Sequence, residues 1–164
     1  WQTPANRKND WFYVNKGLYY KGYNSNETLH LYAASLSMKI NSYAFNVNTL
    51  VSEVRSDVGL FVMGMEYAYI CLNNKMVQII KGSFDGNEEI IYKEPYLEEK
   101  ISFNLHFEGE KYYFGFNDNM LKQFEFVATK GKWVGSRIGI YSRNGNTSKF
   151  EFFNVEEVKK WRNW

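Results

Sequence analysis

Apolar and polar residues alternate along much of this chain, and this alternation limits its fold more than any other feature of the sequence. In residues 101–107 (ISFNLHF), four apolar side chains fall on one side of an extended chain and three polar side chains on the other. The next segment repeats the pattern with Tyr112, Phe114 and Phe116 on one side. A period of two is typical of a strand that packs one face against a core and leaves the other in solvent.

Turn signals divide the chain at short intervals, as at 73–74 (NN), 84–87 (FDGN), 117–119 (NDN) and 143–146 (RNGN). Asn, Asp and Gly favour such turns. The segments expected to form strands are 18–21, 28–39, 43–54, 57–65, 67–73, 76–81, 88–93, 101–107, 111–117, 121–127, 136–142 and 149–157. Residues 155–164 alone suggest one or two helical turns. The sequence therefore predicts one all-β domain over residues 1–164, a two-sheet antiparallel β-sandwich.

The charge balance argues against two classes of partner. The chain has 20 Lys and Arg against 18 Asp and Glu, a formal net charge of +2, so it has no large basic excess to neutralise nucleic-acid phosphates or a membrane surface. Its apolar runs are too short to span a bilayer. The chain starts at Trp1 without an initiator Met or a signal-peptide pattern, and we expect it to be a segment of a longer protein.

The ionisable residues do not form a recognisable catalytic pattern. A hydrolytic sandwich needs closely spaced carboxylates on one strand, but this chain has pairs at 88–89, 98–99 and 156–157, which are typical of solvated turns. His30 and His106 lie far apart in the sequence, without a Cys or second His at ligand spacing. We expect His106, on the polar side of its strand, to be exposed or to face a groove. We assign no catalytic residue.

Two further features are weak candidates for chemistry. Cys71 lies in the apolar run YAYICL and is expected to be a small buried hydrophobe rather than a nucleophile. The acidic turn 83–89 (SFDGNEE) resembles a calcium loop but lacks the D-x-[DN]-x-[DN]-G spacing. A structural calcium ion stays an open alternative, and we assign no metal ligand and no cofactor.

The aromatic content, 13 Tyr, 13 Phe and 5 Trp, is the remaining signal. The apolar face of a pyranose ring packs on a flat aromatic ring, while its hydroxyls need Asn, Gln, Asp, Arg or His beside it. For any one aromatic residue, burial in the core is the competing interpretation. The candidate sugar-binding residues, expected to line one concave sheet, are Tyr67, Tyr69, Tyr113, Trp133, Tyr141, Asn73, Gln78, Asn104 and Arg137.

Four segments, in order along the chain, resemble the C-terminal β-sandwich appended to the catalytic propeller of glycoside hydrolase family 43 β-xylosidases and arabinofuranosidases. The matching segments are 1–20 (WQTPANRKNDWFYVNKGLYY), 35–51 (SLSMKINSYAFNVNTLV), 57–72 (DVGLFVMGMEYAYICL) and 131–158, which contains GKWVGSRIGIYSRN and SKFEFFNVEEV. The resemblance implies a concanavalin A-like jelly roll. The catalytic Asp and Glu residues of such enzymes lie on the propeller, which this chain does not contain.

The resemblance also implies a role and partners. In the xylosidases, an aromatic residue in a Gly-aromatic-x-Gly loop helps to close the propeller's substrate pocket, and the matching residue here is Trp133 in GKWVG. Packing of Trp133 beneath the last hairpin is the competing interpretation. The segment before it, FEFVATKGKW, is shorter than in several xylosidases. We therefore expect a non-catalytic ancillary module that packs on a propeller and binds xylan or xylo-oligosaccharide, in a cytoplasmic or secreted bacterial protein.

Two other hypotheses stay open. One is a purely structural or protein-interaction sandwich without sugar affinity, in which every aromatic residue is buried or committed to an interface. The other is an autonomous enzyme, against which the missing carboxylate pattern argues.

Overall fold

A computed structural model describes residues 11–32, 34–40, 42–127 and 136–158. In these ranges the chain forms thirteen strands and one short 3₁₀ helix. The elements are β1 (Phe12–Val14), β2 (Leu18–Tyr20), η1 (Leu29–Leu31), β3 (Ser35–Met38), β4 (Ala44–Glu53), β5 (Asp57–Met63), β6 (Tyr67–Asn73), β7 (Met76–Gly82), β8 (Glu88–Pro95), β9 (Ile101–Glu108), β10 (Lys111–Phe116), β11 (Asn119–Val127), β12 (Arg137–Arg143) and β13 (Ser148–Glu157).

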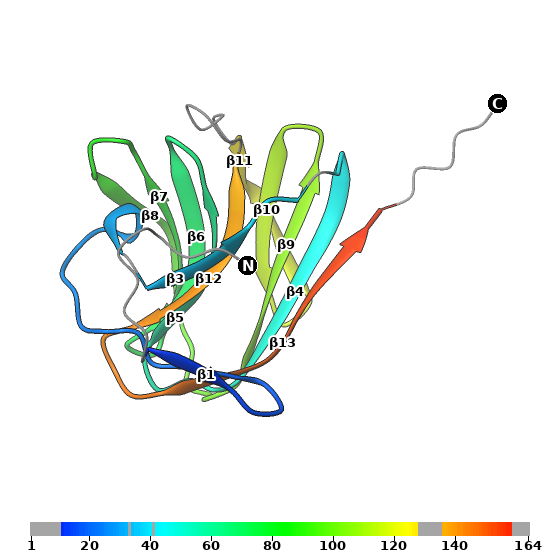
Figure 1. Ribbon diagram of the computed structural model, residues 1–164. Helices are drawn as coiled ribbons and strands as arrows, with labels where there is room; N and C mark the ends of the chain where they lie inside the picture. The colour runs from blue at the N-terminus through cyan, green and yellow to red at the C-terminus, as the bar shows by residue number, and fades with distance from the viewer. Residues whose placement is uncertain (1–10, 33, 41, 128–135, 159–164) are drawn as a thin grey trace.

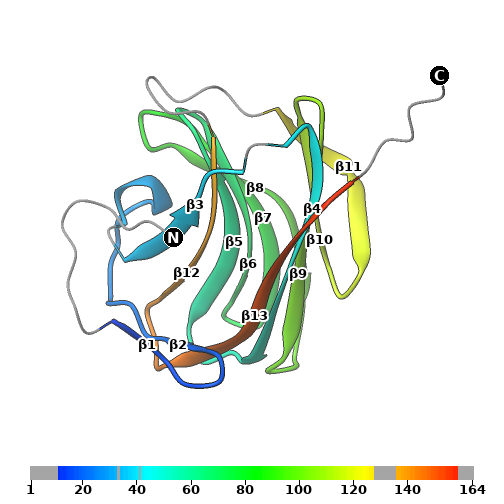
Figure 2. The same cartoon turned by 45° about the vertical axis from the view of Figure 1, so that its right-hand side comes forward.

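The strands form two sheets that face each other (Figures 1 and 2). One sheet has seven strands in the order β1-β2-β13-β4-β9-β10-β11, and the other has six in the order β3-β12-β5-β6-β7-β8. All the strand pairs described are antiparallel. The prediction of an all-β, two-sheet antiparallel sandwich of the jelly-roll type is confirmed.

The alternation of residues places the core between the sheets. Phe103 and Leu105 of β9 are at most 1% exposed and pack inward, as the period-two pattern predicts. From the six-stranded sheet, Leu60 of β5 pairs with Ile70 of β6, and both are fully buried. His106, on the other side of β9, is partly exposed, as expected.

Three local predictions differ from the structure. The expected strand 28–39 is a 3₁₀ turn followed by the short strand β3, and β1 was not predicted. The expected helical turns at 155–164 are wrong for residues 155–157, which belong to β13, because pairing with β4 extends to Phe45 and outweighs the local 3.6 period. Residues 159–164 lie outside the described part. Nowhere in that part is there a helix of the length and apolarity needed to cross a membrane.

Candidate functional site

The predicted sugar-binding residues are divided between the two sheets. Tyr67 and Tyr69 lie on β6 and Tyr141 on β12, in the six-stranded sheet, whereas Asn104 and Tyr113 lie on β9 and β10, in the seven-stranded sheet. The prediction that they line one concave sheet is therefore wrong. Alternation within a strand fixes which residues share a face, but it does not fix which sheet the strand joins.

Tyr67, Tyr69 and Tyr141 are on the outer side of their sheet, as their strand phase predicts, but they are not accessible. Each is at most 1% exposed. The rings of Tyr141 and Tyr67 lie against glycine positions on neighbouring strands: a Cβ built at Gly59 would lie 2.6 Å from Cε1 of Tyr141, and one built at Gly82 would overlap the ring of Tyr67. Cross-strand pairs of an aromatic residue with glycine allow the ring to lie flat on the sheet.

A polar network joins these tyrosines to acidic side chains. The hydroxyls of Tyr67 and Tyr69 donate hydrogen bonds to the carboxylate of Glu88, at 2.6 and 3.1 Å. The Tyr141 hydroxyl donates to Asp57 Oδ1 at 2.8 Å. Burial raises the pKa of Tyr67 and Tyr69, and the adjacent Glu88 carboxylate raises both further. These phenols stay protonated at neutral pH and act as hydrogen-bond donors.

The segment between β2 and β3, of which residues 21–32 and 34 are described, lies over this face (Figure 2). Arg143 of β12 donates to the carbonyl oxygen of Glu27 at 2.9 Å, and the Tyr32 hydroxyl donates to the carbonyl oxygen of Ser142 at 2.8 Å. The His30 ring lies 5.4 Å from the ring of Tyr67. Because this irregular segment covers the sheet, the three tyrosines form a second buried layer and cannot contact a ligand in this conformation.

The other predicted residues of this sheet have local partners. Arg137 donates from Nε to the Ser37 hydroxyl at 2.9 Å, and Gln78 is half-buried beside the Cys71 thiol. Asn73 ends β6 and lines a hollow at the end of the sandwich. The prediction that Cys71 is buried is confirmed, and burial raises the pKa of its thiol well above the ordinary value. Trp133 lies outside the described residues.

The seven-stranded sheet presents a different outer face. The rings of His106 and Tyr113, on β9 and β10, lie nearly parallel, with centroids 6.2 Å apart and planes 27° apart. His106 donates from Nδ1 to the side-chain oxygen of Asn46 at 2.6 Å, and its Nε2 lies 3.5 Å from Oε2 of Glu108. With Met120 and Lys122 these four residues line an open hollow of about 410 Å³.

A row of amide side chains continues from this hollow across the sheet. The side-chain oxygen of Asn48 accepts hydrogen bonds from Ser102 Oγ at 2.7 Å and from Asn104 Nδ2 at 3.0 Å. The oxygen of Asn104 in turn accepts from the backbone N–H of Asp118 at 2.9 Å. Asn104 is therefore buried and holds its neighbours in place, whereas the amide nitrogens of Asn46 and Asn48 are donors that can serve a ligand.

This face combines two flat rings with amide, imidazole, ammonium and carboxylate groups. Such a surface can stack a sugar ring and hydrogen-bond its hydroxyls. Tyr113 and Asn104 were predicted from the sequence as members of this site, whereas Asn46, Asn48 and Lys122 were not. The alternation of these three residues with core residues indicates that they face outward. Only the sheet order, in which β4 and β11 flank β9 and β10, shows that they lie beside His106 and Tyr113.

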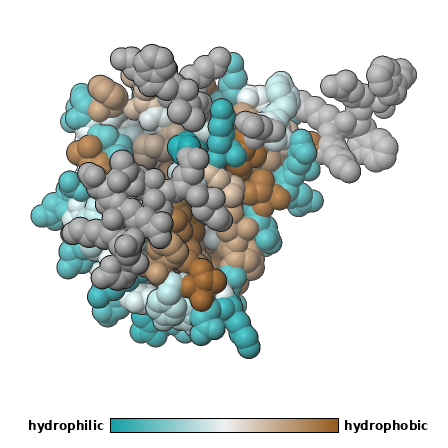
Figure 3. Space-filling view, viewed as in Figure 1, coloured by the Kyte–Doolittle hydropathy of each residue, from teal (hydrophilic) through white to brown (hydrophobic). Residues whose placement is uncertain are grey.

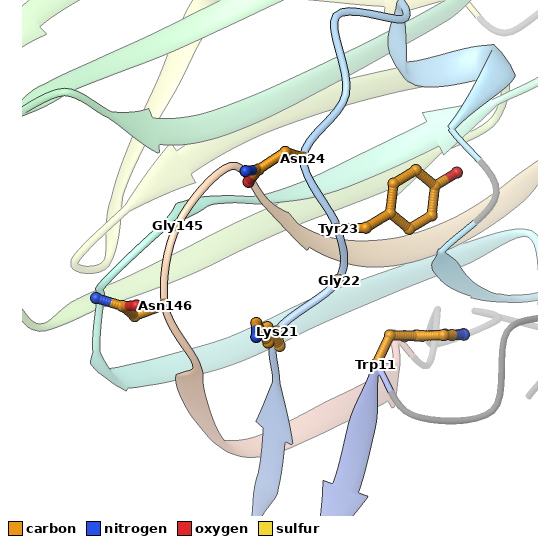
Figure 4. Close-up of a pocket in the computed structure, with 7 residues that line it drawn as sticks. All are labelled: Trp11, Lys21, Gly22, Tyr23, Asn24, Gly145 and Asn146. Atoms are coloured by element: carbon orange, nitrogen blue, oxygen red, sulfur yellow. The ribbon is translucent and has the colours of Figure 1, made fainter.

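A larger hollow, of about 520 Å³, lies beside β1 and β2 and is lined by Trp11, Lys21, Gly22, Tyr23, Asn24, Gly145 and Asn146 (Figure 4). Its aromatic residues do not expose a ring face on which a sugar could stack. Trp11 is only 3% exposed, and its indole nitrogen points away from Asn24 and Asn146 in Figure 4. The Tyr23 ring packs 4.7 Å from the buried Tyr32 ring. This hollow is consequently the weaker candidate for sugar stacking.

Several polar groups of the acidic turn at 83–89 hydrogen-bond to one another. Asp85 accepts hydrogen bonds from the side chains of Ser83 and Asn87, the latter at 2.9 Å, and these bonds lower the pKa of its carboxyl. Glu88 is directed to Tyr67 and Tyr69 instead. Among the described residues, three or more His, Cys, Asp or Glu side chains do not come together in a group that could hold a metal ion.

No protein-family model and no curated protein matches this sequence. Solved structures do match in three dimensions. A bifunctional GH43-CE protein of Bacteroides eggerthii has a TM-score of 0.76 at 12% identity over 94% of this chain. A xylan β-1,4-xylosidase of Bacillus halodurans has a TM-score of 0.65 at 16% identity over 90%. The carbohydrate-binding module CBM66 of Bacillus subtilis has a TM-score of 0.56 at 9% identity over 89%.

The matched structures differ in the share of their own length that this chain spans. This chain spans 23% of the length of the Bacteroides protein and 34% of the xylosidase, but 91% of the CBM66 chain. Identities this low concern the fold alone. This chain has the fold of a β-sandwich that family 43 glycoside hydrolases carry as one part of a longer chain and that CBM66 forms by itself.

Proposed function

We propose that this chain is a non-catalytic, carbohydrate-binding module of a family 43-type glycoside hydrolase that acts on xylan-type polysaccharides. The observation that carries the proposal is the pair of rings of His106 and Tyr113, flanked by the amide of Asn46 on the outer face of the seven-stranded sheet. The xylan class is suggested by the fold that this chain shares with a xylan β-1,4-xylosidase.

The hydrogen-bond geometry of His106 suits a neutral sugar. Because the Asn46 oxygen accepts the Nδ1 proton, the His106 ring is fixed with Nε2 toward Glu108 and the hollow. Sugar hydroxyls can hydrogen-bond to Nε2, donate to the Glu108 carboxylate and accept from Lys122 and the Asn46 amide. Tyr113 is held by a hydrogen bond to Glu125, at 3.4 Å, so its ring is oriented before a ligand binds.

We expect the substitution Tyr113→Ala to weaken binding of xylo-oligosaccharide by about tenfold or more, because it removes a stacking surface. Isothermal titration calorimetry of the 164-residue chain with xylan and xylohexaose measures this. Phe84→Ala is the matched control, since Phe84 is a 71% exposed aromatic residue in the turn before β8 of the other sheet. Equal affinity in Tyr113→Ala and the unsubstituted chain would contradict the proposed site.

The module's second proposed partner is the catalytic propeller of its parent enzyme. An apolar hollow of about 320 Å³ opens between the two sheets and is lined by Phe12, Val14, Leu18, Leu36, Ile140, Phe150, Glu151, Phe152 and Phe153. Val14 is 74% exposed and Phe152 38%, and Figure 3 shows hydrophobic side chains gathered on this side of the molecule. An apolar patch with a polar surround is typical of a protein interface. We propose that the propeller packs here and that Trp133 reaches its substrate pocket.

In the full-length enzyme we expect Val14→Asp to lower the melting temperature of the whole protein, because it puts a charge in the interface. Trp133→Ala should leave the melting temperature unchanged and lower kcat/KM for an aryl xyloside. Differential scanning calorimetry and steady-state kinetics separate these effects. An unchanged melting temperature in Val14→Asp argues against the hollow as the interface, and unchanged kinetics in Trp133→Ala argue against a role in the pocket.

The same hollow favours the alternative of a purely structural sandwich without sugar affinity. That alternative includes the same interface with the propeller but predicts that His106 and Tyr113 do not bind a sugar. Calorimetry with the whole chain therefore discriminates the two, because only the main proposal expects heat of binding and its loss in Tyr113→Ala.

A further inference from the structure

A second aromatic pair lies on the seven-stranded sheet, at the β1–β2 hairpin. Tyr13 and Tyr19 are directly paired across the two strands, and their rings are stacked with centroids 4.8 Å apart and planes 5° apart. Tyr13 is 57% exposed. Two stacked rings held by adjacent strands form a rigid, accessible aromatic surface. A ligand that binds to it causes little further loss of side-chain conformational entropy.

Charged groups hold this pair in position. The ammonium group of Lys149, on β13, lies 5.4 Å from the centroid of the Tyr19 ring and 3.3 Å from Oε1 of Glu151. Glu151 also accepts a hydrogen bond from the Ser52 hydroxyl, at 2.6 Å. These contacts raise the pKa of Lys149 and lower the pKa of Glu151. Both groups are thus charged at neutral pH. They lie beside the Tyr19 ring, where they can hydrogen-bond to the hydroxyls of a sugar stacked on that ring.

Strand β4 connects this second pair to the first. Alternate residues along β4 point outward because Val47, Thr49 and Val51 between them are buried. Asn46 contacts His106 at one end of β4, and Ser52 contacts Glu151 at the other. The six-residue separation of these two corresponds to about 20 Å along an extended strand.

The amide of Asn48 and the half-buried side chain of Leu50 lie between these ends. The His106–Tyr113 pair lies on β9 and β10, next to the Asn46 end of β4, and the Tyr13–Tyr19 pair lies on β1 and β2, beyond β13 at the Ser52 end. A single sugar ring is too short to reach both pairs, whereas a linear oligosaccharide that runs obliquely across β4 and β13 can contact them together.

We propose that this face binds an extended, linear oligosaccharide that runs obliquely across β4 and β13, with the His106–Tyr113 pair at one end and the Tyr13–Tyr19 pair at the other. This inference rests on the proposed function and adds the form of the ligand: an internal stretch of a polysaccharide chain rather than a single terminal sugar. Contact at a second point makes the added binding intramolecular, so affinity should increase with chain length until both pairs are engaged.

The test compares xylotriose with xylohexaose by isothermal titration calorimetry. The unsubstituted chain should bind the hexasaccharide about tenfold more tightly than the trisaccharide. Tyr19→Ala and, separately, Tyr13→Ala should remove most of that advantage and leave trisaccharide affinity unchanged. Because Tyr13 is largely exposed, its variant keeps the test valid if Tyr19→Ala fails to fold.

Tyr113→Ala should weaken binding of both ligands. If Tyr113→Ala weakens both while neither hairpin variant affects xylohexaose, the extended site is wrong and the proposed function stands. If the unsubstituted chain binds neither ligand, or Tyr113→Ala changes nothing, the proposed function itself fails.

Discussion

Arg143→Ala should lower the free energy of unfolding by about 3–5 kcal/mol, because it leaves a buried carboxylate without its partner. Arg143 and Asp57 form an ion pair of 2.9 Å, with side chains that are 9% and 5% exposed. Arg143 also donates to the Glu27 carbonyl oxygen and lies over the Tyr32 and Tyr141 rings. Its loss should loosen segment 21–34 from the six-stranded sheet. Urea unfolding at neutral pH measures the effect.

The loss in free energy of unfolding caused by Arg143→Ala should depend on pH. Burial raises the pKa of Asp57, and the interactions with Arg143 and Tyr141 oppose that rise. When the folded-state pKa lies above the unfolded-state value, the folded protein binds more protons, so stability increases as pH falls through the raised pKa. Without Arg143 that pKa rises further. We therefore expect Arg143→Ala to recover part of its lost stability as the pH falls below 7.

Arg137→Ala is the control on the same strand. Arg137 is half-buried and donates one hydrogen bond to the Ser37 hydroxyl, so its removal should cost about 1 kcal/mol. Similar losses for both arginine variants, or a pH-independent deficit in Arg143→Ala, would contradict the importance of the buried ion pair.

Gly22→Ala should destabilise the protein by about 2–4 kcal/mol, through backbone strain and overlap together. Gly22 has φ of +66°, and a Cβ there would overlap the carbonyl oxygen of Ser142 and the hydroxyl of Tyr32. Gly22 and the Tyr32 hydroxyl thus both meet the carbonyl oxygen of Ser142 on β12. Thermal or urea unfolding measures the loss, and the substituted segment should exchange its amide protons faster.

Gly109→Ala separates strain from overlap. Gly109 has φ of +68°, close to that of Gly22, but a Cβ there would meet only the Tyr43 hydroxyl, at 3.7 Å. We expect it to lose about 1–2 kcal/mol from the left-handed backbone alone. Equal losses at the two glycines would show that the close approach of segment 21–34 to β12 contributes nothing.

The sequence predicted the sandwich and most strands because the evidence for them is local. In β9, Phe103 and Leu105 alternate with Ser102 and Asn104, and nothing else in the chain is needed to assign their faces. The strand expected at 28–39 was correct only for 35–38, because the segment before β3 is fixed by distant partners, such as the Ser142 carbonyl oxygen that accepts a hydrogen bond from the Tyr32 hydroxyl. Contacts across 110 residues leave no periodic signal.

The candidate site was predicted only in part, for the same physical reason. The outward phase of Tyr67, Tyr69 and Tyr141 was correct, yet an irregular segment covers them, and alternation carries no information about such a cover. Tyr113 was identified on its own strand, but its neighbours on β4 and β11 are brought to it by sheet order. The Tyr13–Tyr19 pair depends on β1, a three-residue strand too short to show a period.

The most direct test of the sugar-binding surface is a nuclear magnetic resonance titration of the isotopically labelled chain with xylohexaose. Binding at this surface should shift the side-chain amide signals of Asn46 and Asn48 and the ring signals of His106 and Tyr113 with one common affinity. Signals of the buried Tyr67 should not move. Largest shifts at Asn24 and Asn146, beside the hollow near Trp11, or no shifts at any ligand concentration, would contradict it.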